Sequence, residues 1–463
     1  MAKSNQSGGL VNTQGSMSYL ILISIVAAIG GLLFGFDTAV ISGANAYLKT
    51  EFSLSSIMEG WMVSSVLVGC TIGAGIAGTL SDSFGRKKTM LLTAVLFTAG
   101  GLGQALAPSL EFLIIFRIIC GMGIGMASML SPMYIAEVSP PHLRGRLVSL
   151  QQLAIVTGIL VAYMSNSIIA HTGLADANKW RWMLGAEVAP AAIYFILLFF
   201  VPESPRWLTK FGDMEKARSI IARIAGSEVA NKEIDEIQKS LKQEKGKFSE
   251  LFKPGIRLAL IIGVSLAVLQ QFVGINTVIY YAPIIFKKTG FGAASALGAT
   301  VWVGAINFIF TLVAIWLIDK IGRKALLLYG AVGMGISLFM IGLLFDLKAF
   351  GGPWILIFIL LYIACFAASF GPVVWVMISE IYPNKVRGRA ASVATMSNWV
   401  SNFVVTLLFP VMLDALGEPI SFWIFFVWCI VSFIFVARLV PETKGKSLEE
   451  IEKSWDVVSF EEQ

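Results

Sequence analysis

Long apolar segments follow one another along the whole chain, separated by short polar or basic turns. Each segment has about 20 residues or more, enough to cross a hydrocarbon core of about 30 Å as a helix. The pattern therefore predicts about twelve membrane-spanning helices. The predicted spans are residues 18–46, 58–80, 89–107, 111–135, 147–170, 181–201, 256–286, 294–318, 324–345, 353–379, 390–413 and 420–440.

Three short motifs occur twice, at nearly constant displacement. The motif Asp-x-x-Gly-Arg-Lys begins at residues 82 and 319, which are 237 positions apart. A glutamate followed by Arg-Gly-Arg recurs after 243 positions, and Pro-Glu-Ser/Thr after 239. The charged residues of these motifs are Asp82, Arg86, Glu137, Arg144 and Glu203 in the first copy, and Asp319, Arg323, Glu380, Arg387 and Glu442 in the second. Such a repeat predicts an all-α membrane protein made of two six-helix bundles, related as parallel repeats.

Between the sixth and seventh predicted spans, residues 205–255 form a charged stretch in which isoleucines recur at helical spacing. This spacing predicts amphipathic helices on the cytoplasmic face, with a flexible charged linker as the alternative. A further surface helix is expected over 447–453. The expected organisation is an N-terminal tail (1–17), a first bundle (18–204), a cytoplasmic helical domain (205–255), a second bundle (256–440) and a C-terminal tail (441–463).

Composition agrees with a membrane protein. Hydrophobic residues make up 56% of the chain and charged residues 14%, whereas soluble domains have roughly 25% charged residues. The net charge of +6 is not the footprint of a nucleic-acid-binding protein, because the basic residues lie in short turns. All four cysteines fall inside apolar segments, which favours small buried hydrophobes over disulfides.

The basic turns that contain the paired motifs all lie on one side of the predicted membrane, and the positive-inside rule makes that side cytoplasmic. Both termini are then cytoplasmic, in a multi-pass protein of the plasma membrane (the inner membrane of a bacterium). Residues 1–17 lack the basic start and short apolar core of a signal peptide, so we expect the first apolar segment to be retained.

Three ionisable residues lie inside predicted spans: Asp37 in the first, Arg117 in the fourth and Glu187 in the sixth. Each is about 10–15 Å from the outer end of its helix. Charges at such depth are costly, face the bundle interior and commonly pair. Burial opposes ionisation of a carboxylate and a nearby arginine favours it, so movement of Arg117 relative to Asp37 would control a proton. A structural ion pair without titration is the alternative.

Uncharged polar residues concentrate in the fifth span and in the second bundle: Gln152, Gln270, Gln271, Asn276, Tyr280, Asn307, Trp375, Asn398 and Trp399. Amides both donate and accept hydrogen bonds, which suits a neutral polyhydroxylated ligand, and tryptophan suits the apolar face of a pyranose. Hydrogen bonding between helices is the alternative. On an unbroken helix Gln271 and Asn276 point apart, but a break at Gly274 would bring them together.

The motifs together resemble the sugar porter family of the major facilitator superfamily over nearly the whole chain. The matching pieces are Gly-Phe-Asp37-Thr-Ala-Val-Ile-Ser-Gly, both Asp-x-x-Gly-Arg-Lys turns, both Glu…Arg-Gly-Arg signatures, Pro202-Glu-Ser-Pro-Arg-Trp-Leu, Gln270-Gln271-x-x-Gly-Ile-Asn276 and Pro441-Glu-Thr-Lys-Gly. The resemblance implies alternating access around a central sugar site. It implies sugar contacts for Gln152, Gln270, Gln271, Asn276, Asn307, Trp375 and Asn398, with Phe34 as an aromatic residue beside the site.

Within that family the chain is close to bacterial proton-coupled D-xylose/D-glucose symporters and similar to the animal facilitative glucose carriers. Asp37, Arg117 and Glu187 match the symporters, whereas the facilitative carriers have an uncharged residue in place of Asp37. Asn398 instead matches the glucose carriers, which favours D-glucose over D-xylose or another aldose.

The predicted function is therefore proton-coupled symport of a neutral monosaccharide. A proton-independent uniporter and a sugar-binding sensor are the alternatives, and the short segment after Pro441 disfavours the sensor. An enzyme is disfavoured because the sequence offers no nucleophile–base pair or metal cluster. We expect no metal and no cofactor other than the coupling proton, and a monomer.

The paired charged motifs form the predicted cytoplasmic gate. We expect their acidic and basic residues to pair between helix ends and across the two halves, which would stabilise the outward-facing state. Each exposed pair alone contributes under about 1 kcal/mol, so such a gate depends on several pairs acting together.

Overall fold

The computed structural model describes residues 15–242, 248–253, 256–350, 352–383 and 386–444, and every regular element in these ranges is a helix. Ten helical segments are long and apolar enough to cross a membrane. One of them, α17 (Arg387–Leu439), contains the predicted span 390–413 and all but the last residue of 420–440, and α3 corresponds to the predicted span 89–107. The prediction of an all-α protein with about twelve spans is confirmed.

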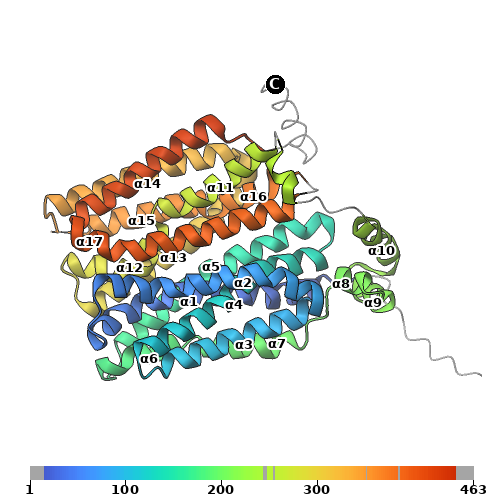
Figure 1. Ribbon diagram of the computed structural model, residues 1–463, viewed down its shortest axis with the longest axis horizontal. Coiled ribbons are helices and arrows are strands. Elements are labelled where there is room, and N and C mark those ends of the chain that lie inside the picture. Colours follow the sequence, from blue (N-terminus) through green and yellow to red (C-terminus); the bar gives the residue numbers. More distant parts are fainter. Residues whose placement is uncertain (1–14, 243–247, 254–255, 351, 384–385, 445–463) are drawn as a thin grey trace, which may run out of the picture.

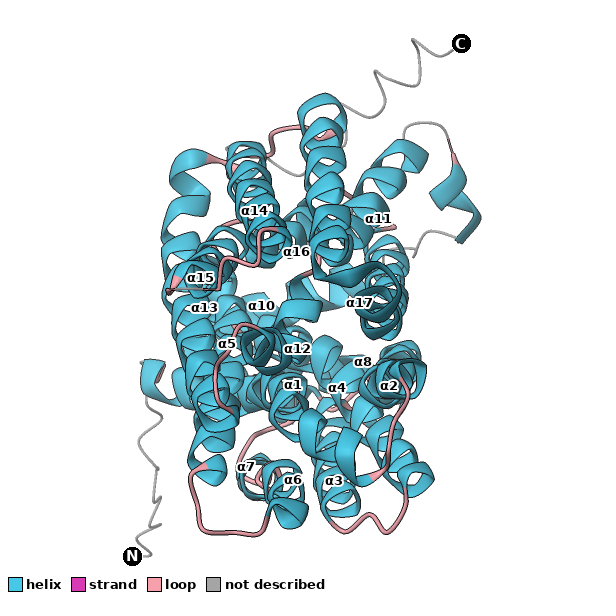
Figure 2. Cartoon of the chain, turned by 90° about the vertical axis from the view of Figure 1, so that its left-hand side faces the viewer, coloured by secondary structure: helices cyan, strands magenta, loops and turns pink. Residues whose placement is uncertain are grey.

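Figure 1 shows two bundles lying side by side, with the short helices α8–α10 at one end. The first bundle comprises α1 (Met17–Glu51), α2 (Ser56–Phe84), α3 (Arg86–Ala105), α4 (Leu110–Val138), α5 (Pro141–Ala170), α6 (Asp176–Gly185) and α7 (Val188–Leu198). The second comprises α11 (Ile256–Phe272), α12 (Ile275–Lys288), α13 (Ala293–Ile321), α14 (Arg323–Asp346), α15 (Trp354–Ala367), α16 (Phe370–Glu380) and α17 (Arg387–Leu439). Seen along the helices, the two bundles lie one above the other (Figure 2).

Three of the predicted spans are broken in the structure. Gly274 has φ 91°, a left-handed conformation that separates α11 from α12 at the predicted position. Continuous helices are predicted over 181–201 and 353–379, but the first breaks between α6 and α7 and the second between α15 and α16. In both places a proline follows the break, Pro190 and Pro372. A proline lacks an N–H group and its ring clashes with the carbonyl four residues earlier, which favours an interruption at both places.

The helices between the bundles are α8 (Pro205–Lys210), α9 (Met214–Ala225) and α10 (Ser227–Lys242), followed by a 3₁₀ helix, η1 (Phe248–Phe252). α8–α10 bury a small core of their own that includes Leu208, Ile221 and Ile234. The prediction of amphipathic helices is confirmed and the alternative of a charged linker is wrong. The helix predicted over 447–453 lies outside the described residues.

α8–α10 are attached to the first bundle. The Trp207 indole donates a hydrogen bond to the Asp82 carbonyl at 3.1 Å. The Arg223 guanidinium lies over the Tyr19 ring, 3.8 Å from its centroid, and the Ser16 N–H donates to the Arg223 carbonyl at 2.9 Å. These contacts hold the short helices against the ends of α1 and α2. We call this the α8–α10 end of the molecule.

The two bundles meet closely at the opposite end. A Cβ placed on Gly60 of α2 would lie 2.1 Å from the Leu407 carbonyl oxygen of α17, so only glycine permits this approach. The Tyr163 hydroxyl of α5 donates to the Ile279 carbonyl of α12 at 2.8 Å. The Ser56 hydroxyl of α2 also donates to the Asp414 carboxylate of α17. The opposite end is therefore closed by direct contact between bundles.

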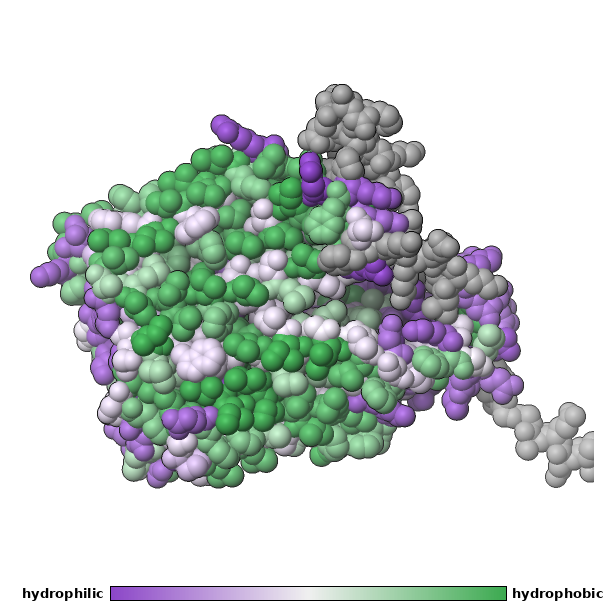
Figure 3. All heavy atoms as spheres, in the orientation of Figure 1, coloured by the Kyte–Doolittle hydropathy of each residue, from purple (hydrophilic) through white to green (hydrophobic). Residues whose placement is uncertain are grey.

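The outer surface carries the features of a membrane protein. Figure 3 shows a broad apolar band across the visible face of the bundles, with most of the hydrophilic residues at the two ends. Large hydrophobic side chains are exposed on the membrane-spanning helices, among them Trp302 and Trp316 of α13, and Phe200 is exposed just after α7. Lipid contact accounts for their exposure, since the backbone polar groups beneath them are satisfied within helices. The chain is a multi-pass membrane protein.

Candidate functional site

A central cavity of about 310 Å³ lies between the two bundles. Every predicted substrate residue lines it: Phe34, Gln152, Gln270, Gln271, Asn276, Tyr280, Asn307, Trp375, Asn398 and Trp399. They come from α1, α5, α11, α12, α13, α16 and α17, so no single helix could form this site. The cavity size suits a small ligand held by a few converging polar groups.

The break at Gly274 assembles a chain of amides on the second bundle. The Asn276 amide nitrogen donates to Gln271 Oε1 at 2.6 Å, and the Gln271 nitrogen donates to Asn398 Oδ1 at 3.2 Å. Asn398 in turn donates to Gln270 Oε1 at 2.8 Å. Gln270 donates to the Phe370 carbonyl, at the start of α16, at 2.7 Å. Because each amide holds the next, the whole set is oriented before a ligand arrives.

The first bundle contributes a different wall. Gln152 lines the cavity from α5, and so does its neighbour Gln151, which is not among the predicted site residues. Both side-chain polar atoms of Gln151 are buried without a hydrogen-bond partner. A buried amide that lacks partners is costly unless a ligand or water satisfies it. The adjacent Gln-Gln pair is the sequence signal that would have identified Gln151.

Aromatic rings lie where the two walls meet. Phe34 of α1 packs on Trp399 of α17 with ring centroids 5.5 Å apart. Trp399 is nearly fully buried, whereas Trp375 is 36% exposed and presents an open indole to the cavity side. The apolar face of a ring-shaped ligand has a partner there.

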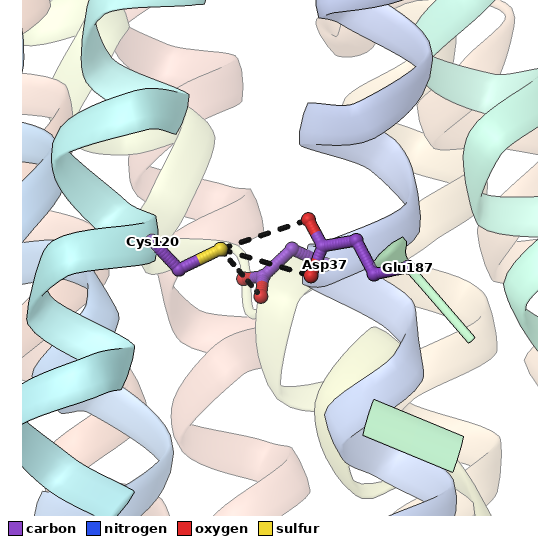
Figure 4. A group of neighbouring side chains, drawn as sticks. All are labelled: Asp37, Cys120 and Glu187. Atoms are coloured by element: carbon purple, nitrogen blue, oxygen red, sulfur yellow. Dashed lines mark hydrogen bonds between the residues drawn. The ribbon is translucent and has the colours of Figure 1, made fainter. Parts of the chain in front are cut away.

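The three predicted membrane-embedded charges all lie inside the first bundle and are fully buried. Asp37, Glu187 and the thiol of Cys120 form one cluster, with a ligand atom of each within 4.8 Å of the others (Figure 4). Glu187 sits at the break between α6 and α7. Asp37 comes from α1 and Cys120 from α4, so three elements converge. Cys120 was predicted to be only a small buried hydrophobe, and its place beside two carboxylates is a correction.

The predicted ion pair between Asp37 and Arg117 is not formed. The Arg117 guanidinium donates instead to the carbonyls of Met62 and Val63 in α2, at 2.9 and 3.0 Å. It also donates to Gln104 Oε1 in α3 at 3.2 Å. A guanidinium has five N–H donors, and three oxygens on two neighbouring helices satisfy it without a carboxylate. Asp37 Oδ2 is left buried with no hydrogen-bond partner.

The repeated charged motifs build two matching networks at the α8–α10 end. In the first bundle Arg86 donates to both Glu137 oxygens, at 2.9 and 2.8 Å, and pairs with Asp82 at 3.1 Å. In the second bundle Arg323 donates to both Glu380 oxygens, at 3.2 and 2.9 Å. Arg323 also pairs with Asp319 at 3.0 Å.

A second carboxylate completes each network. Glu203 accepts from the backbone N–H of Arg86 at 2.8 Å, and Glu442 accepts from that of Arg323 at 2.9 Å. Both therefore cap the start of a helix, where the helix dipole favours an anion. Burial raises the pKa of Glu442, but the backbone N–H groups of Lys444, Arg323, Lys324 and Thr443 outweigh it, and the net effect is a lowered pKa.

The central arginines of these networks do not pair across the two halves in this conformation, and cross-half pairing stays a prediction for the outward-facing state. Arg86 and Arg323 each pair with acidic residues of their own bundle. Arg144 donates to the Ala136 carbonyl at 3.1 Å, and Arg387 to the Tyr382 carbonyl at 3.2 Å. The physical reason is that the two bundles are separated at the α8–α10 end. They touch at the opposite end, and the central cavity extends to Ser379 and Ala391, which lie towards the α8–α10 end.

Comparison with known proteins fits this geometry. Residues 23–455 match the family model described as sugar (and other) transporter. The chain is 47% identical over 444 residues to the arabinose-proton symporter of Bacillus subtilis, covering 95% of this chain and 96% of that protein. It is 42% identical over 468 residues to the glucose transport protein of Synechocystis, covering 96% of this chain and 100% of the other.

A solved structure agrees with the fold as well. The inward open conformation of the xylose transporter XylE from E. coli superposes with a TM-score of 0.85 at 41% identity, covering 94% of this chain and 100% of that one. The family match spans both bundles and includes the cavity and the buried charged cluster. The chain belongs to the sugar (and other) transporter family, the sugar porters of the major facilitator superfamily.

Proposed function

We propose that this protein is a proton-coupled symporter that carries a neutral monosaccharide through the central cavity by alternating access. One observation supports it above the others: a cavity of oriented, uncharged amides lies between the bundles, while a buried pair of carboxylates lies inside one of them. The amides match sugar hydroxyls, which donate and accept hydrogen bonds. The carboxylates can hold a proton, because two such groups in contact do not both ionise. No other cofactor is proposed.

D-Glucose is the proposed substrate, with D-xylose or another aldose as the alternative. The argument rests on Asn398, which takes part in the amide chain through both its oxygen and its nitrogen. The names of the two relatives and of the solved structure cover arabinose, glucose and xylose, so they support the monosaccharide class without separating its members.

We place the α8–α10 end in the cytoplasm of a cell whose plasma membrane contains the protein. The basic turns lie at this end, which the positive-inside rule makes cytoplasmic. We therefore propose that both termini are cytoplasmic as well. The described conformation then corresponds to the inward-facing state, in agreement with the similarity to an inward open structure. The proposed division is a tail (1–17), a first bundle (18–204), a helical domain (205–255), a second bundle (256–440) and a tail (441–463), in a monomer.

In this state the proposed proton step has Asp37 facing Glu187 while Arg117 is occupied by carbonyl and amide oxygens. With a proton shared in the carboxylate pair, Asp37 no longer attracts the arginine. Loss of that proton leaves two charges in contact, which favours a rearrangement that brings Arg117 back towards Asp37. Sugar and proton are then coupled because both favour the same conformational change.

The decisive experiment is uptake of labelled D-glucose and D-xylose into proteoliposomes, with and without an inward proton gradient. Accumulation of glucose above its outside concentration only with the gradient is expected. Uptake that merely equilibrates, whether or not the gradient is present, would identify a uniporter. Binding with no uptake at all would favour a sensor.

A further inference from the structure

The thiol of Cys120 occupies a position that packing alone does not explain. Its sulfur lies 3.5 Å from Asp37 Oδ1 and 3.6 and 3.7 Å from the two oxygens of Glu187 (Figure 4). The residue is fully buried on α4, with its Cβ against Gly100 of α3. An alanine would satisfy that helix contact equally well. The sulfur itself faces carboxylate oxygens, which are poor neighbours for an apolar atom.

A thiol has one S–H donor, and here two acceptors from different helices lie within its reach. It can donate to Asp37 or to Glu187 by rotation about one bond, but not to both at once. Asp37 Oδ2 is buried without a hydrogen-bond partner, and Gln104 is the other uncharged polar side chain that interacts with this carboxylate. The carboxylate that is ionised gains most from the donor, since hydrogen bonds to charged groups are the stronger ones.

We propose that Cys120 is a positioning residue of the proton site, whose S–H turns to whichever of Asp37 and Glu187 is ionised while the other keeps the proton. This inference rests on the proposed proton coupling and adds a third member to the site. It makes the proton affinity of the cluster depend on a side chain that carries no charge.

The groups around the Cys120 thiol determine what its removal should do to the proton affinity of the cluster. Asp37 approaches from α1, Glu187 from the α6–α7 break and Arg117 from α4 itself. α2 contributes Cys70, a second buried thiol, and α3 contributes Gln104, which accepts from Arg117. Removal of the S–H leaves an ionised carboxylate with one donor fewer. The protonated form is then favoured, and half-maximal uptake should occur at higher pH.

The experiment compares Cys120→Ala, Cys120→Ser and the control Cys429→Ala, a buried thiol in the second bundle. Sugar counterflow without a gradient reports folding and sugar binding, and proton-driven uptake is measured against pH. Cys120→Ala should move the midpoint upward by about half a pH unit, the scale of one weak hydrogen bond. Cys120→Ser keeps a donor, and a stronger one, so its midpoint should stay or move downward. Cys429→Ala should match the unmodified protein.

An unchanged midpoint in Cys120→Ala, or a rate reduced equally at every pH, overturns the inference and leaves only packing. If Cys120→Ala loses counterflow, the test rests on Cys120→Ser. This variant retains a hydrogen-bond donor, so an upward shift of its pH midpoint for proton-driven uptake would contradict the proposal. Absence of proton-driven uptake in the unmodified protein would instead refute the proposed function. The two failures are therefore distinguishable.

Discussion

Asn276 donates a hydrogen bond to Gln271 across the left-handed turn at Gly274, with 2.6 Å between the two atoms. On a continuous helix these amides would point apart. Replacement of Gly274 would strain the positive φ and drive a Cβ to within 2.8 Å of the Phe425 ring. The hydrogen bond that links Asn276 to the amide chain of the cavity therefore depends on the glycine at position 274.

We predict that Gln271→Ala weakens D-glucose binding about tenfold or more, since an unsatisfied buried partner costs about 1–3 kcal/mol. Two groups lose their partner at once, Asn276 and Asn398. Isothermal titration calorimetry of the purified protein measures the effect. Asn178→Ala, an exposed amide on α6, is the matched control and should bind normally. Equal affinity in the Gln271 variant would remove this amide from the sugar site.

Asp37→Asn should retain sugar exchange and lose proton-driven accumulation. The amide resembles the protonated carboxyl in size and cannot ionise, so the step that couples proton release to movement is absent. Counterflow and gradient-driven uptake in proteoliposomes separate the two activities. Glu111→Gln, an exposed change on α4, serves as control. A variant that still concentrates sugar against its gradient would exclude Asp37 as the coupling residue.

The two repeated networks should differ in their effect on stability. Arg86 and Glu137 are 8% and 9% exposed, whereas Arg323 and Glu380 are 11% and 24% exposed. Removal of one partner from a buried pair costs about 3–5 kcal/mol, and exposure reduces that cost. Glu137→Gln should therefore lower the unfolding temperature more than Glu380→Gln. Thermal unfolding in detergent tests this order, and the reverse order would show that burial does not govern these pairs.

Glu442 should give the protein a pH-dependent contribution to stability. Its pKa is lowered in the folded state, so the contribution is present above the unfolded value of about 4.3 and is lost as the pH falls through the folded value. Glu442→Gln should destabilise by about 0.3–1 kcal/mol at neutral pH, the usual effect of a charge at a helix N-terminus.

The same substitution should have a smaller effect at acidic pH, because Glu442 itself becomes protonated as the pH falls through its lowered pKa. Denaturant titration of both proteins at the two pH values measures the difference. Glu236→Gln on the exposed face of α10 is the matched control. A constant difference at both pH values would argue against the cap.

Sequence reasoning identified the lining of the cavity, because amides such as Gln271 and Asn398 stand out within apolar spans. It identified the break at Gly274 but not those at Glu187 and Ser369, although Pro190 and Pro372 were visible in the sequence. A proline can kink a helix or end it, and only the packing around it determines which.

The partners of buried charges could not be read from depth alone. Arg117 and Asp37 are at similar depth, but the arginine is directed to carbonyls on α2 that no sequence pattern marks. Cys120 was overlooked for a related reason, because a cysteine within an apolar span resembles any small core residue. Arg86 and Arg323 found their partners within their own bundles, since the cross-bundle distance depends on the conformational state.

The buried acids belong to the first bundle, whereas the amide chain belongs to the second, so the proposed proton site and this chain of amides share no side chain. Evolution can therefore alter one without disturbing the other. Exchange of the amides on α11, α12 and α17 is expected to change which sugar is bound and to leave the buried acids in place. Under the proposed mechanism, loss of the acid on α1 would leave sugar binding in place and remove proton coupling. The fold therefore keeps the proposed proton site and the amide chain in separate bundles.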